Sequence, residues 1–118
     1  MNTARELQRL ADELRSALGV PVYDLEPPTR EAAVAQPHIL IGPMAMDEAQ
    51  FGNWARNTVL EIQYWCDGAN QALLADIAER MAQALIQSGW TPTDTQVITG
   101  TPRSWRGVAV EAEKIIGR

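Results

Sequence analysis

The sequence predicts an α+β fold, a two-layer domain in which helices pack on one face of a mostly antiparallel or mixed sheet. Two segments, residues 3–19 and 67–90, repeat apolar residues at the spacing of a helix. Residues 54–66 instead alternate apolar and polar side chains, as a half-buried strand does. Short apolar runs and close turns make up the rest. The 118 residues fit one domain, residues 1–118, with the order α-β-β-β-α-β-β.

The first helix has a start signal and a stop signal. Thr3 and Glu6 have the spacing of a capping box, in which each side chain meets a free backbone N–H of the first turn. Gly19 is placed to end the helix in the left-handed conformation. The expected apolar face consists of Leu7, Leu10, Ala11, Leu14 and Leu18.

Two short strands are expected next, at residues 20–24 and 38–42. Pro21 has no N–H for a strand ladder, which favours an edge strand or the start of a strand. Residues 38–42 read His-Ile-Leu-Ile-Gly and fit a strand that is covered on both faces. A polar loop that contains prolines separates these strands, and residues 43–53 are expected to form a second loop.

Residues 54–66 give the strongest strand prediction. One set of alternating residues is apolar and is expected to face the core: Leu60, Ile62, Tyr64 and Cys66. The other set is expected to face outward: Val59, Glu61, Gln63 and Trp65. Side chains that alternate in this way lie on opposite faces of a strand.

A second helix and two closing strands complete the prediction. Asp67 can cap the helix and Gly89 can end it. The expected buried stripe of this helix is Leu73, Leu74, Ile77, Met81, Ala84 and Leu85. Residues 93–100 and 104–115 then read as strands joined by a turn. In the second of them, Val108, Val110 and Ala112 alternate with Ala109, Glu111 and Glu113.

Composition limits the class of protein. The formal net charge is −5, which argues against a nucleic-acid binder that neutralises phosphates. Ten basic residues include only one lysine, Lys114; a coding bias and an interface role for arginine explain this equally well. One cysteine allows no internal disulfide and no cysteine-based metal site, which indicates a reducing compartment. The first residues lack a signal core and no run reaches the ~20 apolar residues of a membrane span.

Catalytic chemistry has few candidates. His38 is the only histidine, and at the start of an apolar strand it fits a structural role. Cys66 falls on the core-facing phase, where cysteine is usually a small buried hydrophobe. The glycines are spaced like turns, and no paired carboxylates stand out. We therefore expect a protein that is not an enzyme, with no catalytic residue, no cofactor and no bound metal.

The tryptophans are more informative. The chain has four: Trp54, Trp65, Trp90 and Trp105. Trp90 follows the helix stop and is expected to fill the core. Trp and Arg are enriched at interface hot spots, although a Trp can also cover the open edge of a small core. The candidate interface residues are Trp54, Arg56, Trp65, Arg103, Trp105 and Arg106.

Taken in order, these features resemble the tail terminator (tail completion) proteins of long-tailed bacteriophages, including prophage and gene-transfer-particle relatives. The matching stretches are "VYDLEPP", "PHILIG" and "IQYWC". The matching positions are Val22, Tyr23, Pro27, Pro28, Pro37, Ile39, Leu40, Ile41, Gly42, Ile62 and Trp65. His38 stands where the family usually has an aromatic residue such as tyrosine.

The resemblance implies a virion protein of the tail or neck, assembled in the host cytoplasm. Such proteins form rings, commonly hexamers, that cap the head-proximal end of the tail tube, stop its polymerisation and receive the head connector. The loops at 26–36 and 44–53 would then contact a neighbouring subunit or the tube. DNA would pass through the lumen without sequence-specific binding, and no membrane would be involved.

Three alternatives stay open at this point. The first is a head–tail connector or neck protein of the same particle. The second is a cytoplasmic dimeric adaptor unrelated to phage, which would share the α+β architecture. The third, a small enzyme, would have to depend on His38 and Cys66.

Overall fold

The computed structural model describes residues 3–24, 36–42, 45–47, 55–100 and 104–117. The elements are α1 (Thr3–Leu18), β1 (Val22–Asp24), β2 (His38–Ile41), β3 (Ala45–Asp47), β4 (Ala55–Asp67), α3 (Gln71–Gln87), β5 (Thr91–Thr99) and β6 (Trp105–Gly117). The predicted α+β class and the predicted order of the long elements are confirmed. The short strand β3 is an addition, since it lies in the segment that we expected to be a loop.

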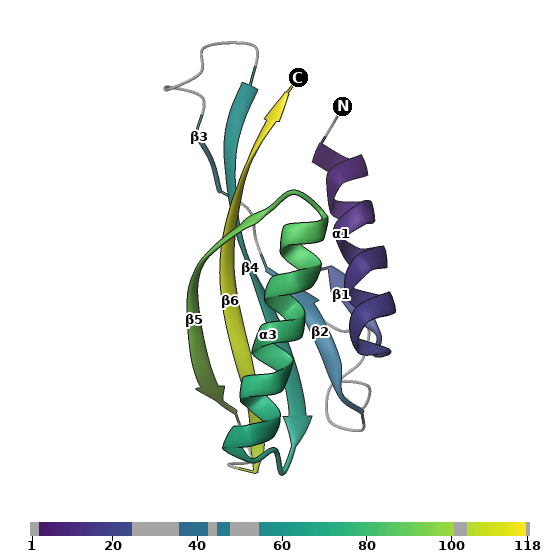
Figure 1. Ribbon diagram of the computed structural model, residues 1–118, viewed down its shortest axis with the longest axis vertical. Helices are drawn as coiled ribbons and strands as arrows, with labels where there is room; N and C mark the ends of the chain where they lie inside the picture. The colour runs from purple at the N-terminus through teal and green to yellow at the C-terminus, as the bar shows by residue number, and fades with distance from the viewer. Residues whose placement is uncertain (1–2, 25–35, 43–44, 48–54, 101–103, 118) are drawn as a thin grey trace.

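The strands form one sheet in the order β1-β2-β4-β6-β5, and β3 pairs with β4 beside this path. Both helices lie on the same face of the sheet, side by side (Figure 1). The central pair, β4 and β6, is antiparallel and runs the length of the molecule, with residues 55–67 opposite residues 105–117. The fold is therefore the predicted two-layer arrangement.

The edge strand β1 pairs with β2 in parallel, whereas the other strand pairs are antiparallel. Pro21 comes just before β1, and its carbonyl accepts the Ile39 N–H at 2.9 Å, so its position at the start of an edge strand is confirmed. Parallel neighbours cannot be joined by a tight turn, because the chain has to cross over to start the second strand at the same end. This topology alone requires a long connection between Asp24 and His38.

The core lies between the helices and one face of the sheet. From β4 it takes Leu60, Ile62, Tyr64 and Cys66, which are buried as predicted, and from β6 it takes Val108, Val110 and Ala112. From the helices it takes Leu10, Ala11, Leu14, Leu74, Ile77, Met81, Ala84 and Leu85. Trp90 is 2% exposed and fills the core as expected. Leu73, which we expected in the buried stripe, lies outside the core, with its side chain 45% exposed.

The ends of the helices agree in part with the sequence signals. Gly19 and Gly89 both have positive φ, at 65° and 85°, and end their helices as predicted. The cap of α3 is Asn70, whose side-chain oxygen accepts the Leu73 N–H at 2.8 Å. Asp67, the residue that we expected to cap, is instead the last residue of β4, where it pairs with Trp105.

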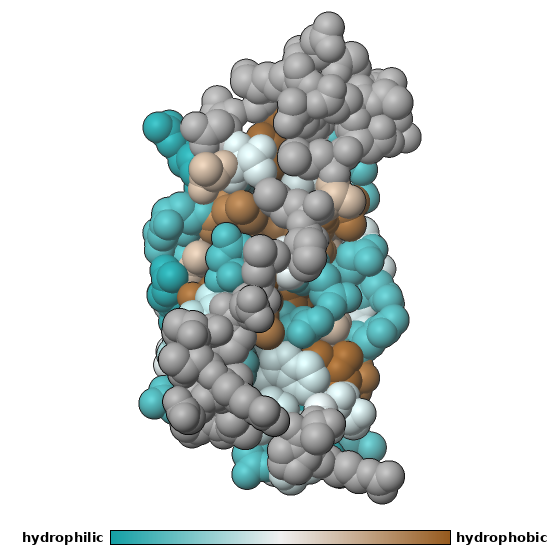
Figure 2. Space-filling model, turned by 180° about the vertical axis from the view of Figure 1, so that it is seen from behind, coloured by the Kyte–Doolittle hydropathy of each residue, from teal (hydrophilic) through white to brown (hydrophobic). Residues whose placement is uncertain are grey.

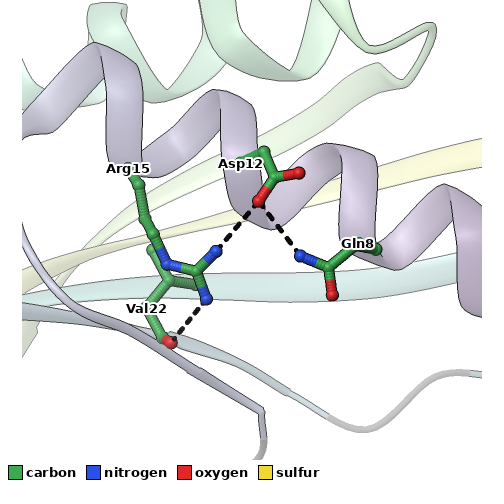
Figure 3. A network of polar contacts seen from close by, with 4 residues as sticks. All are labelled: Gln8, Asp12, Arg15 and Val22. Atoms are coloured by element: carbon green, nitrogen blue, oxygen red, sulfur yellow. Dashed lines mark hydrogen bonds and ion pairs between the residues drawn. The ribbon is translucent and has the colours of Figure 1, made fainter.

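An arginine on the first helix joins that helix to the edge strand (Figure 3). The Arg15 guanidinium donates to the Asp12 carboxylate at 3.0 Å and to the Val22 carbonyl at 3.5 Å. The same carboxylate oxygen accepts from Gln8 at 3.0 Å. The planar fork of arginine suits this double contact, since its donors point in fixed directions.

Candidate functional site

The second face of the sheet has no helix among the described residues, and Figure 2 views the molecule from that side. Residues opposite one another in neighbouring strands share a face, so the pairing register identifies its members. They include Tyr23, His38, Leu40, Glu61, Gln63, Trp65, Trp105, Ala109 and Glu111. We call this the helix-free face. In Figure 2, apolar patches in brown are interspersed with hydrophilic residues in teal.

Aromatic rings gather at one end of the helix-free face. The His38 ring lies between Tyr23 and Trp105, with ring centroids 6.0 Å and 5.9 Å away. His38 is 2% exposed, and its Nδ1 lies 3.0 Å from the Gln36 carbonyl oxygen. These contacts fit the structural role expected of His38. Trp105 is 8% exposed, so in the single chain its ring offers little surface to a partner.

Trp65 begins a ladder of polar contacts along β4. Its Nε1–H donates to Gln63 Oε1 at 3.0 Å, and Gln63 Nε2 donates to Glu61 Oε1 at 2.7 Å. A Cβ atom at Gly100 would lie 3.0 Å from the Trp65 ring, so this ring reaches the turn after β5. Trp65 is half-buried and lies on the outward phase, as predicted.

A row of carboxylates crosses the other part of the same face. Glu61 lies directly opposite Glu111, which lies directly opposite Asp94 on β5. Among the described residues, the side chains that donate to these carboxylates are neutral: Gln63, Thr93 and Gln96. Like charges opposite one another destabilise a sheet. This part of the face therefore favours a basic partner and disfavours the phosphates of a nucleic acid.

The structure places four of the six candidate interface residues. Trp65 and Trp105 share the helix-free face. Arg106 lies opposite Cys66, on the phase that faces the helices, and its side chain is exposed. Arg56 lies in β4 opposite Ile116, and Trp54 and Arg103 lie outside the described residues, as do most of the two loops at 26–36 and 44–53. The structure thus brings the two tryptophans together and separates them from Arg106.

A groove between α3 and β5 is a second candidate surface. Its volume is about 650 Å³, and Arg106 is the one charged residue among those that line it. Its walls are Gln71, Leu74, Ala75, Ala78, Thr95, Val97, Thr99, Arg106 and Val108. Val97 is 65% exposed, the highest value among the large hydrophobic residues that the structure describes. No local sequence pattern indicates this groove, because its two walls come from separate elements.

The chemistry of the buried polar groups is limited. Burial raises the pKa of the Cys66 thiol and the pKa of the Tyr64 hydroxyl, so both groups stay neutral at ordinary pH. Within the described ranges, no group of three or more His, Cys, Asp or Glu residues could hold a metal ion. No helix in the same ranges is long and apolar enough to cross a bilayer.

The fold has known counterparts. No protein-family model and no curated protein sequence matches the chain. Among solved structures, it is similar to a chain of the "Virion of native gene transfer agent (GTA) particle", with a TM-score of 0.66 and 17% sequence identity. The similarity covers 96% of this chain and 92% of that chain, so it extends over nearly the whole length of both.

Proposed function

We propose that the protein is a structural subunit of a phage-like particle, located in the virion and not acting as an enzyme. The observation that supports this most is the fold, which a chain of a gene transfer agent virion shares over 96% of the length of this protein. The order of sequence motifs agrees with it, because the same motifs resemble tail terminator proteins. Fold alone does not define function, so the surfaces have to supply the second argument.

Within the particle, we propose the role of tail terminator: a ring, of six copies by resemblance, that caps the head-proximal end of the tail tube and receives the head connector. A ring requires a heterologous interface, in which one patch of a subunit meets a different patch of the next. One of these patches is, in our proposal, the helix-free face, which carries Trp65 and Trp105. The carboxylates Glu61, Glu111 and Asp94 would also disfavour adhesion of DNA passing through a lumen.

The proposal is tested by the mass of the purified protein in solution. Light scattering over a concentration series, with electron microscopy of the same fractions, should give a closed ring of about six copies. A dimer at every concentration would support the adaptor alternative and contradict the terminator role. If the protein is a monomer, the same measurement is repeated after mixing with purified tail tubes. The terminator role then requires the protein at one end of each tube, and its absence there would count against the role.

A neck protein of the same particle is the nearest alternative. The terminator binds tail tubes in the absence of heads, whereas a neck protein binds the head connector in the absence of tubes. Pull-down of tubes alone and of connector alone therefore separates the two roles.

A further inference from the structure

The edge strand β5 is protected along one half only. Edge strands expose unpaired N–H and C=O groups, and proteins usually guard them with proline, a bulge or a charged residue. The first half of β5 has these features: Pro92, a break in register between Pro92 and Asp94, and the charge of Asp94 itself. Residues 95–99 read Thr-Gln-Val-Ile-Thr and have none of them. Among the described residues, they pair regularly with β6 and with no strand on their other side.

The unguarded half of β5 is also the half that lines the groove. Thr95, Val97 and Thr99 point to the side of the sheet on which α3 lies, and all three line the groove with the first turns of α3. They span about 13 Å of strand. An unpaired strand edge beside an apolar hollow is the arrangement in which a peptide adds as a further strand.

The charge of the groove narrows the choice of peptide. Arg106 lies opposite Thr99, at the end of β5, and its side chain is exposed. Among the described residues, the side chain of Arg106 has no hydrogen-bond or ion-pair partner. The first residue of α3, Gln71, also lines the groove, and a helix N-terminus favours negative charge. Both features favour a carboxylate at this end.

We propose that residues 95–99 and α3 form a docking groove for an extended segment of another protein, a segment with small apolar residues at alternate positions and a carboxylate beside Arg106. Its backbone pairs with the free edge of β5, antiparallel to it. Alternate side chains contact Leu74, Ala78 and Val97. This inference does not depend on the role proposed above, because it concerns one surface of the single chain.

The test uses the full-length protein and the peptide acetyl-Glu-Thr-Val-Thr-Val-Thr-Val-Gly-Lys(fluorescein)-amide, in which the glutamate and the valines share one face of the added strand. Binding is measured by anisotropy. We expect saturable binding. Binding should weaken about tenfold or more when lysine replaces the glutamate, and also when the backbone nitrogens that face β5 are methylated. Equal binding of the methylated peptide, or of a peptide with the same composition but no alternation, would overturn the proposal. So would the absence of binding.

Two variants with a matched control locate the site. Val97→Lys and Arg106→Glu should each weaken binding about tenfold. Ile115→Lys should leave binding unchanged, because Ile115 is also a β-branched strand residue and 51% exposed but does not line the groove. Circular dichroism checks that each variant folds. If Val97→Lys abolishes self-association of the protein in light scattering, a second copy occupies the groove and the proposal of a different partner is wrong.

Ring formation and peptide binding are separate readouts. If the protein forms rings but does not bind the peptide, only the proposal of the docking groove is contradicted. If it binds the peptide but neither forms rings nor caps tubes, only the terminator role is contradicted.

Discussion

Lys114 Nζ lies 2.5 Å from Glu6 Oε2, so an ion pair joins the last described strand to the first helix across 108 positions of sequence. The Glu6 side chain is 1% exposed and the Lys114 side chain 17% exposed. The same ammonium donates to the Ser88 carbonyl at 2.9 Å, at the C-terminal end of α3, where a cation also interacts favourably with the helix dipole. The single lysine of the chain therefore holds α1, α3 and β6 together.

Removing one partner of this pair should destabilise the protein strongly. Lys114→Met leaves the buried Glu6 carboxylate unpaired and should lower the free energy of unfolding by about 3–5 kcal/mol. Glu6→Leu combined with Lys114→Met should recover most of that loss, because no charge is then buried alone. Urea denaturation at pH 7 measures both. The control is Arg80→Met, which breaks the exposed pair with Asp76 and should cost about 0–1 kcal/mol. Similar losses for Lys114→Met and Arg80→Met would contradict this prediction.

Gly89→Ala should be costlier than Gly68→Ala. Both glycines have positive φ, 85° and 69°, and a left-handed conformation costs a residue with a Cβ about 1–2 kcal/mol. At Gly68 no atom lies within 4 Å of the added Cβ, so the backbone cost is the whole effect. At Gly89 the Cβ would lie 2.8 Å from Lys114 Nζ, which Glu6 and Ser88 hold in place. Thermal or urea unfolding of the two variants compares them directly, and equal losses would show that Lys114 moves aside without cost.

The protein should lose stability in alkali, and Cys66 should contribute to that loss. Burial raises the pKa of its thiol in the folded state, whereas an unfolded cysteine titrates near pH ~8.5. Above that pH the unfolded chain has released a proton that the folded chain retains, so the free energy of unfolding falls as pH rises. Below that pH, the contribution of the buried, protonated thiol to the free energy of unfolding is fully present. Urea unfolding at pH 7, 9 and 10 should give a smaller decline in Cys66→Ala than in the wild type. The raised pKa of Tyr64 acts in the same direction and should leave part of the decline in the variant.

Among the candidate interface residues whose side chains the structure describes, Trp65 combines partial exposure with an orientation fixed by its hydrogen bond to Gln63. We predict that Trp65→Ala reduces ring formation, measured as the ring fraction in light scattering at fixed concentration. Leu73→Ala is the control, since Leu73 is an exposed apolar residue on α3, away from the helix-free face. Unchanged ring formation and tail length in Trp65→Ala would remove this strand face from the interface.

Local patterns predicted the parts of the fold that depend on neighbours in sequence. The alternation of residues 59–66 gave the correct two faces of β4 because a strand imposes a period of two. The prediction that Leu73 is buried was wrong, because Leu73 lies about 100° around the helix from Leu74, beyond the face that meets the sheet. Asp67 could not cap α3 because pairing with Trp105 extends β4 through it.

Contacts between distant segments left little local signal. The parallel pairing of β1 with β2, the ion pair of Glu6 with Lys114 and the groove beside Val97 each join elements that are far apart in the chain. Glu6 illustrates the difficulty, since its spacing from Thr3 indicates a cap while its burial depends on a lysine near the other end of the sequence. For the candidate site, the sequence identified the outward phase of Trp65 but not that Arg106 lies on the opposite face.

The position of β6 also affects how the protein folds during synthesis. This strand is the last in the described chain, and it lies between β4 and β5, both of which are made before it. A ribosome that adds about 5–20 residues per second therefore completes β5 about 1–4 seconds before it completes β6, and β4 earlier still. Until residues 105–117 emerge, β4 and β5 lack their shared partner and expose backbone to other chains. During that interval the unpaired edges of these two strands are open to pairing with other chains, which is a route to aggregation.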